Sequence, residues 1–171
     1  MNRAIVALLV CLTSAAGFAQ NDLRLLVQMN FEDNLELAAG QGPAEFTGEG
    51  QPSYVEGKLG RALDLAKGQR VVLPSAGNLD KSRGTICMWV KPHWAGDLYK
   101  NHVFLQDDLP FKTGENCIRL WHWCVGVMRL DVRDAGDRYI PSQVKSWQAE
   151  QWHHLAATWD ATHGVVLYLD G

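Results

Sequence analysis

The feature that most constrains the fold is a period-two alternation of apolar and polar side chains along most of the chain. In residues 164–170 the apolar Val165, Leu167 and Leu169 alternate with positions that include Tyr168 and Asp170. A strand with one buried face shows this period because successive side chains point to opposite sides. Similar short runs recur about every 8 to 12 residues, separated by turn residues. The pattern predicts an all-β sandwich or barrel.

Eleven segments are predicted to be strands, and no long linker or repeat divides them. They are residues 23–31, 44–48, 61–66, 70–74, 84–92, 102–106, 116–123, 127–134, 138–144, 152–160 and 164–170. The last of them is followed by Asp170-Gly171, a dipeptide typical of hairpin turns. We therefore expect a partner strand beyond this turn.

The alternation also assigns the two faces of each strand. The positions predicted to face the core are Ile86, Met88, Val90, Leu130, Val132, Leu155, Ala157, Trp159, Leu167 and Leu169. The positions predicted to face outward carry many aromatic and hydrogen-bonding groups. A merely solvated sheet does not require so many rings.

The first 19 residues are typical of a secretory signal peptide. Arg3 precedes an apolar run at residues 4–12, and Gly17-Phe18-Ala19 is a small-x-small cleavage site. The run is about half the roughly 20 residues of a membrane-spanning helix, so no membrane insertion is expected. We therefore expect residues 1–19 to be removed and residues 20–171 to form one domain that is secreted, periplasmic or at the cell surface.

Charge and cysteine content exclude several classes of function. Loss of Arg3 with the signal peptide changes the net charge from −3 to −4, and this mild acidity argues against nucleic acid as a partner. Cys87, Cys117 and Cys124 then remain, so at most one disulfide can form. Cys117 and Cys124 lie seven residues apart along one extended segment, too far apart for a bridge. Buried thiols are the simplest interpretation.

Several motifs together resemble the bacterial laminin G-like, concanavalin A-like domain family. They are MNFEDNL at 29–35, GKLGRALDL at 57–65, TICMWVKP at 85–92, WHHLAATWD at 152–160 and LYLDG at 167–171. The resemblance covers about residues 23–171 and implies a two-sheet antiparallel jelly-roll sandwich. It also implies a return strand after LYLDG and a closing strand that pairs near residues 29–35. We therefore expect a domain that is incomplete at its C-terminus, with its last strands missing, in a longer protein.

The sequence does not support catalysis. Hydrolases that share this sandwich, such as laminarinases, carry E-x-D-x-x-E on one strand. The nearest stretch, LDVRDAGD at residues 130–137, contains no glutamate. His153 and His154 are adjacent in a strand and point to opposite faces, so a shared metal ion is not expected; a structural role is. The prediction is therefore no enzymatic activity within these residues.

Glu32 and Asp33 are the candidate metal ligands. They follow the first predicted strand, and their carboxylates could bind Ca²⁺. The resemblance implies a calcium ion near this position, completed by acidic residues of the closing strand. The alternative is a polar turn in which Asp33 caps local N–H groups. Calcium is the one cofactor that the sequence indicates.

Carbohydrate recognition requires flat rings for sugar C–H groups and polar side chains for hydroxyls. The outward-facing candidates are Trp89, Trp121, Arg133, His154 and Tyr168, and the loop residues His93, Trp94 and Tyr99 could form a rim. The alternative for each ring is packing.

The predicted function is a secreted, non-catalytic module that binds a polysaccharide or other glycan, or targets a longer bacterial extracellular protein to its substrate. One alternative is a structural or adhesive domain that contacts protein. Another is the N-terminal part of a glycoside hydrolase whose active site lies beyond residue 171. The sequence gives no indication of oligomeric state.

Overall fold

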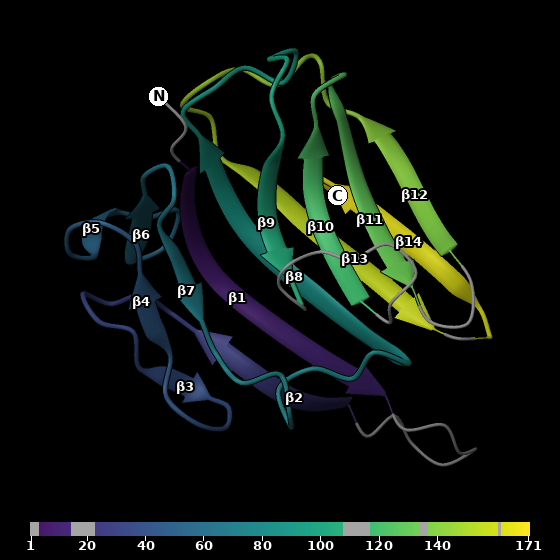
Figure 1. The fold of residues 1–171 in the computed structure, drawn as a ribbon, viewed down its shortest axis with the longest axis horizontal. Coiled ribbons are helices and arrows are strands. Elements are labelled where there is room, and N and C mark those ends of the chain that lie inside the picture. Colours follow the sequence, from purple (N-terminus) through teal and green to yellow (C-terminus); the bar gives the residue numbers. More distant parts are fainter. Residues whose placement is uncertain (1–3, 15–22, 108–116, 134–136, 161) are drawn as a thin grey trace.

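The computed structural model is a sandwich of two antiparallel sheets (Figure 1). It describes residues 4–14, 23–107, 117–133, 137–160 and 162–171. Those residues contain strands and turns but no helix, which confirms the predicted all-β, two-sheet architecture. It follows that no helix in the described part of the chain is long and apolar enough to span a membrane.

The larger sheet contains eight strands drawn from both ends of the chain. Its main path follows the order β14 (Gly164–Leu169), β13 (His153–Asp160), β8 (Arg83–Pro92), β1 (Ala4–Ser14), β2 (Leu23–Met29) and β3 (Leu37–Ala39). A side branch joins β5 (Ser53–Glu56) to β6 (Arg61–Leu65), and β6 pairs with β1. This sheet therefore depends on pairings between segments far apart in sequence.

The second large sheet is built from consecutive strands. Its order is β12 (Asp137–Gln143), β11 (Val127–Arg133), β10 (Cys117–Trp123) and β9 (His102–Gln106). A separate pair is formed by β4 (Glu45–Thr47) and β7 (Arg70–Val72). Figure 1 shows the four-stranded sheet lying over β8, β13 and β14. All eleven predicted strands are present, whereas β1, β3 and β5 were not predicted.

Strand β1 is formed by residues that the sequence predicts to be part of a signal peptide. Its backbone pairs with β8 on one side and with β2 and β6 on the other. A strand inside a covered sheet can have a near-continuous apolar sequence, which is also the character of a signal peptide. The segment occupies the place beside β2 where the resemblance implies a closing strand. Its removal by cleavage remains a prediction.

The core lies between the two sheets, where the predicted inward faces meet. Ile86, Met88 and Val90 of β8 are at most 2% exposed, and Leu130 of β11 is fully buried. Gly84 allows this packing, because a Cβ atom there would lie 2.5 Å from Cζ2 of Trp159. The predicted inner faces of β8, β11 and β13 are thus confirmed. The three described cysteines, Cys87, Cys117 and Cys124, are not in disulfides.

Candidate functional site

The five predicted ligand-binding residues lie on the outer faces of two different sheets. Trp121 and Arg133 belong to β10 and β11 of the four-stranded sheet. Trp89, His154 and Tyr168 belong to β8, β13 and β14 of the eight-stranded sheet. The structure therefore does not bring the five residues together, and they belong to two separate surfaces.

The first surface, which we name the arginine–tryptophan face, is the outer side of β10 and β11. The inner positions of β10 include Ile118 and Leu120, which are at most 1% exposed, so the alternate positions project outward. Trp121 pairs in register with Arg129, and Arg119 pairs with Asp131. The face consists of Arg119, Trp121, Trp123, Arg129, Asp131 and Arg133.

Trp121 is held between charged side chains at the centre of this face. The guanidinium carbons of Arg119 and Arg129 lie 3.9 Å and 5.5 Å from its ring centroid. Its Nε1–H donates a hydrogen bond of 2.7 Å to Oδ2 of Asp131, and Nη2 of Arg129 donates one of 2.8 Å to Oδ1. Trp121 is consequently only 8% exposed and Asp131 only 3%. Burial lowers the pKa of Arg119, and the neighbouring Asp131 opposes that shift.

Trp123 provides the exposed ring of the arginine–tryptophan face. It is 38% exposed, its ring centroid lies 6.3 Å from that of Trp121, and the Arg129 guanidinium carbon lies 5.2 Å from it. Val103 of β9, which pairs in register with Trp121, is 47% exposed. Sequence reasoning did not include Trp123, Arg119 and Arg129 among the ligand-binding residues, although Trp123 and Arg119 lie two residues from Trp121 and Arg129 lies four residues from Arg133.

The second surface, the tryptophan–histidine face, contains Trp89, His154 and Tyr168. Trp89 and His154 pair in register, and their ring centroids are 5.0 Å apart. Nζ of Lys58 lies 5.1 Å from the Trp89 ring centroid, and Trp89 also packs in a small cluster around the fully buried Ala62. Tyr168, on the edge strand β14, is 46% exposed. The most exposed ring of this face therefore lies at its margin.

His153 and His154 do not share a site. His153 stacks on Trp147, with ring centroids 3.9 Å apart, and its Nδ1 lies 2.8 Å from Oδ2 of Asp170. His154 lies on the opposite side of the strand against Trp89. The predicted structural role is confirmed for His153.

Glu32 and Asp33 lie against the start of β6. Nε of Arg61 donates a hydrogen bond of 2.9 Å to Oδ1 of Asp33, and the backbone N–H of Arg61 donates one of 3.2 Å to Oε1 of Glu32. Gly60 has a φ of +61°, and any Cβ there would collide with the Glu32 carboxylate. Both carboxylates thus serve the turn, and the described residues contain no group of three potential metal ligands. Calcium binding here remains a prediction.

Of the three loop residues predicted to form a rim, His93, Trp94 and Tyr99, the prediction is wrong for Trp94. Trp94 is only 4% exposed and stacks on His102, with ring centroids 4.1 Å apart. His93 contacts Glu150 and Asp64 through its two ring nitrogens, whereas Tyr99 is 78% exposed. An alternation rule cannot place loop rings, because a loop has no fixed period.

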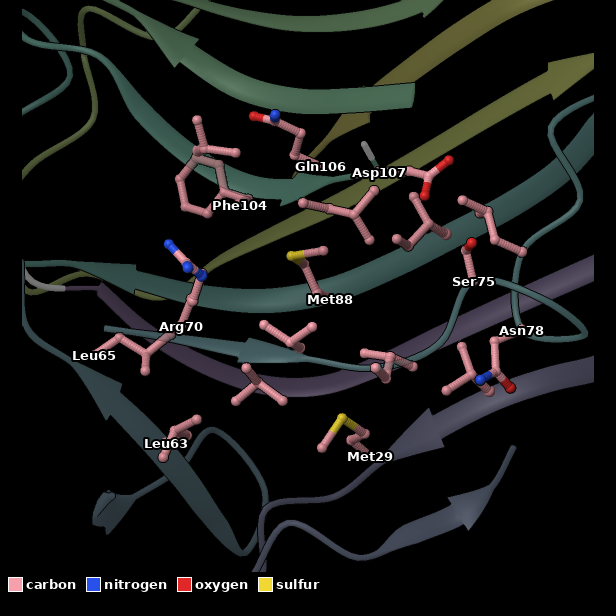
Figure 2. A pocket seen from close by; sticks show the side chains of 18 of the residues that line it. Met29, Leu63, Leu65, Arg70, Ser75, Asn78, Met88, Phe104, Gln106 and Asp107 are labelled. Carbon is pink, nitrogen blue, oxygen red and sulfur yellow. The ribbon is translucent and has the colours of Figure 1, made fainter. Parts of the chain in front are cut away.

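A pocket of about 450 Å³ opens between the two sheets (Figure 2). Figure 2 shows Leu63 and Met88 in its wall and Asp107 at its margin. Asp107 is engaged by Lys81, with Nζ and Oδ2 2.6 Å apart, and the side chain of Asn78 bonds the backbone of Gln41 and Pro74. The lining also includes the polar side chains of Gln69, Arg70, Ser75 and Gln106, but most of its residues are apolar. It suits apolar groups better than a sugar.

Comparison with known proteins identifies one family. The family model described as the concanavalin A-like lectin/glucanases superfamily matches residues 65–171. The matched region includes all four strands of the four-stranded sheet together with β8, β13 and β14. No curated protein and no solved structure gave a match.

Proposed function

The chain belongs to the concanavalin A-like lectin/glucanase superfamily, and from this premise we propose that it is a non-catalytic carbohydrate-binding module that uses its arginine–tryptophan face. The observation that carries the proposal is the exposed Trp123 ring beside Trp121, which its polar neighbours hold in place. A rigid aromatic ring with polar groups around it is the arrangement that a pyranose requires.

The contacts of this face match the two chemical sides of a sugar. Trp123 and Val103 offer apolar surface for C–H groups. Arg129 offers N–H donors for oxygen atoms, and Gln143, which pairs in register with Val127 at the Trp123 end of β11, is exposed and offers both a donor and an acceptor. Because Arg129 is already oriented by Asp131, little side-chain entropy remains to be lost on binding.

The tryptophan–histidine face is the weaker candidate for the same role. Trp89 contacts Lys58, Ala62 and His154. These side chains cover much of its ring and leave little of it for a ligand. Tyr168 is exposed at the edge of the sheet. The face therefore lacks an exposed ring at its centre.

We further propose that the module is secreted and directs a longer extracellular protein to a polysaccharide. The signal-like sequence of residues 1–19 supports export. The described residues of the arginine–tryptophan face include one carboxylate, Asp131, which is already bonded to Trp121 and Arg129. Glycoside hydrolysis normally uses two carboxyl groups, so this face is suited to binding.

Affinity electrophoresis of the full chain in gels that contain single soluble polysaccharides tests the proposal. We expect at least one polysaccharide to retard the protein, and Trp123→Ala to remove most of that retardation. Tyr168→Ala is the matched control, since it also removes a partly exposed ring but from the other sheet. Retardation abolished by Tyr168→Ala and unchanged by Trp123→Ala would refute the assignment of the face.

A further inference from the structure

We propose that the pocket between the two sheets binds a small amphipathic acid, a molecule with an alkyl chain and one carboxylate, as in a fatty acid. The pocket lies between the sheets, whereas the arginine–tryptophan face is on the outside, so this site does not depend on the proposed glycan binding. Three features of the pocket support it: an enclosed apolar floor, polar side chains that already have partners, and a cation at one end.

The pocket has the size and the floor of a small-molecule site. Its volume of about 450 Å³ lies within the range of about 300–1,000 Å³ that is common for such sites. Met29, Ile86 and Met88 line it and are each at most 2% exposed, so its floor is enclosed. Methionine side chains are flexible and polarizable, and they adapt to the shape of an apolar ligand. The floor therefore offers an alkyl chain a position away from water.

Most polar side chains in the wall of the pocket already have partners within the protein. The side-chain amides of Gln69 and Asn78 each accept a hydrogen bond from the backbone and donate to the backbone. Gln106 is engaged as well, and Nζ of Lys81 lies 2.6 Å from Oδ2 of Asp107. These groups stabilise the wall, so they are less available to a ligand.

Arg70 is the charged group of the lining that is open to a ligand. Arg70 and Asp107 are the two charged residues among the described lining. Within the described part of the chain, the Arg70 side chain has no hydrogen bond or ion pair, whereas Asp107 is paired with Lys81. A guanidinium donates hydrogen bonds and can bond both oxygens of a carboxylate through two parallel N–H groups. A carboxylate is therefore the group that complements this end.

The positions of these side chains give the ligand an orientation. Figure 2 shows Arg70 at one end of the pocket, with its guanidinium pointing toward Phe104, and Ser75 and Asp107 at the other end. Met88 lies between the two ends. An acid whose carboxylate is bonded by Arg70 would therefore place its alkyl chain along Phe104 and Met88.

Calorimetric titration of the full chain at pH 7.5 with decanoate, 1-decanol and decyltrimethylammonium tests the proposal. The three probes share an alkyl chain and differ in the charge at one end. We expect decanoate to bind at least about tenfold more tightly than decanol, the change that one charge-assisted hydrogen bond typically produces. We expect decyltrimethylammonium to bind more weakly than decanol, because its cation would be repelled by Arg70.

Three variants locate the site, and each changes an exposed side chain, so an unchanged melting temperature is expected for all of them. Arg70→Gln should reduce the affinity for decanoate about tenfold and leave the affinity for decanol unchanged. Lys67→Gln is the matched control, because Lys67 is a nearby exposed cation outside the lining, and it should leave decanoate binding unchanged. Ser75→Trp, which places a large ring at the opposite end, should weaken binding of both decanoate and decanol.

Each contrary result overturns a stated part of the proposal. Equal affinities for decanoate and decanol would overturn the preference for an acid, and so would a decanoate affinity that Arg70→Gln leaves unchanged. Binding that persists undiminished in Ser75→Trp would place the ligand elsewhere. Binding of none of the three probes would overturn the pocket as a ligand site and would leave the proposed glycan binding untouched.

Discussion

The two large sheets of the sandwich differ in how they are assembled and in what they present to solvent. The four-stranded sheet is made of β9 to β12 in consecutive order, whereas the eight-stranded sheet joins β1, β2, β8 and β13 from distant parts of the chain. On the outside, the first carries an exposed tryptophan among arginines. The second carries Trp89, packed against its neighbours.

The two sheets therefore differ in role: the eight-stranded sheet contributes more to the stability of the fold, and the four-stranded sheet carries the proposed binding surface. Pairing of distant segments loses more chain entropy than pairing of neighbours, so the eight-stranded sheet depends more on each of its internal strands. The four-stranded sheet needs only local hairpins. Outer side chains of the four-stranded sheet can therefore be used for ligand recognition with a smaller effect on the stability of the fold.

Deletion of residues 1–14 should have the largest effect, because it removes β1 from the interior of the eight-stranded sheet. The deletion removes the pairing with β2, β6 and β8. Each lost backbone hydrogen bond costs about 0.5–1.5 kcal/mol, and a whole domain is stable by about 5–15 kcal/mol. We expect loss of cooperative urea unfolding, followed by circular dichroism.

The unfolding of the deleted chain tests whether the eight-stranded sheet depends more on each internal strand than the four-stranded sheet does. Supplying residues 4–14 as a separate peptide should restore part of the cooperative transition. Unchanged cooperative unfolding of the deleted chain would show that β1 is dispensable, as the predicted cleavage after residue 19 requires, and that the larger sheet is not the more sensitive one.

Trp121→Ala should have the next largest effect and would show how much of the arginine–tryptophan face is structural. The substitution removes a buried ring and leaves Asp131 with one hydrogen bond fewer. We expect the free energy of unfolding to fall by about 3–5 kcal/mol, measured by urea denaturation. Trp121→Phe, which retains a ring but not the donor, should lose less. Equal losses would show that the ring itself contributes little.

Acid should destabilise the protein through His102 of the four-stranded sheet. Burial, together with the nearby His122 and Lys100, lowers the pKa of His102 from 6.5 to about 4. The unfolded chain therefore binds the extra proton first. The contribution of His102 to stability is therefore complete above about pH 6.5 and is lost as the pH falls toward 4, by about 1–2 kcal/mol after allowance for solvent screening.

Urea midpoints at pH 7.5 and pH 4.5 measure this effect. His102→Phe is the matched control, because phenylalanine can still stack on Trp94 but cannot titrate, so the pH dependence should become smaller. An unchanged pH dependence in this variant would assign the acid sensitivity to other groups.

Trp123→Ala and Tyr168→Ala should have the smallest effects on stability. Both side chains are more than one-third exposed, and exposed substitutions typically change the free energy of unfolding by no more than about 0.5 kcal/mol. Thermal denaturation of the two variants measures this. A loss above about 2 kcal/mol for Trp123→Ala would show that the ring is part of the packing and would weaken the case for a binding surface.

Much of the fold was predictable from the sequence. Strands such as β8 and β13 alternate strictly between buried and partly exposed positions, so alternation gave both their position and their orientation. The strand β1 was not predicted, because an apolar run without alternation is typical of both a signal peptide and an internal strand. The strand β3 has only three residues, too few to show a period.

The candidate site was predicted only in part. Trp121 and Arg133 were correctly placed facing outward, but alternation cannot show which outward rings are covered by neighbours. The cover on Trp121 comes from Arg119 and Arg129, one of them across the strand pair. The register that places Arg129 opposite Trp121 depends on the hairpin between β10 and β11, which the predicted strands did not specify.

The most direct test is a nuclear magnetic resonance titration that maps the bound surface of the full, isotope-labelled chain. Oligosaccharides of a polysaccharide that retards the chain in affinity electrophoresis are added, and shifts of backbone amides and tryptophan indole N–H groups are followed. We expect the largest changes at the Trp121 and Trp123 indoles and along β10 and β11. Changes confined to β8, β13 and β14, with those indoles unmoved, would contradict the assignment of binding to the four-stranded sheet.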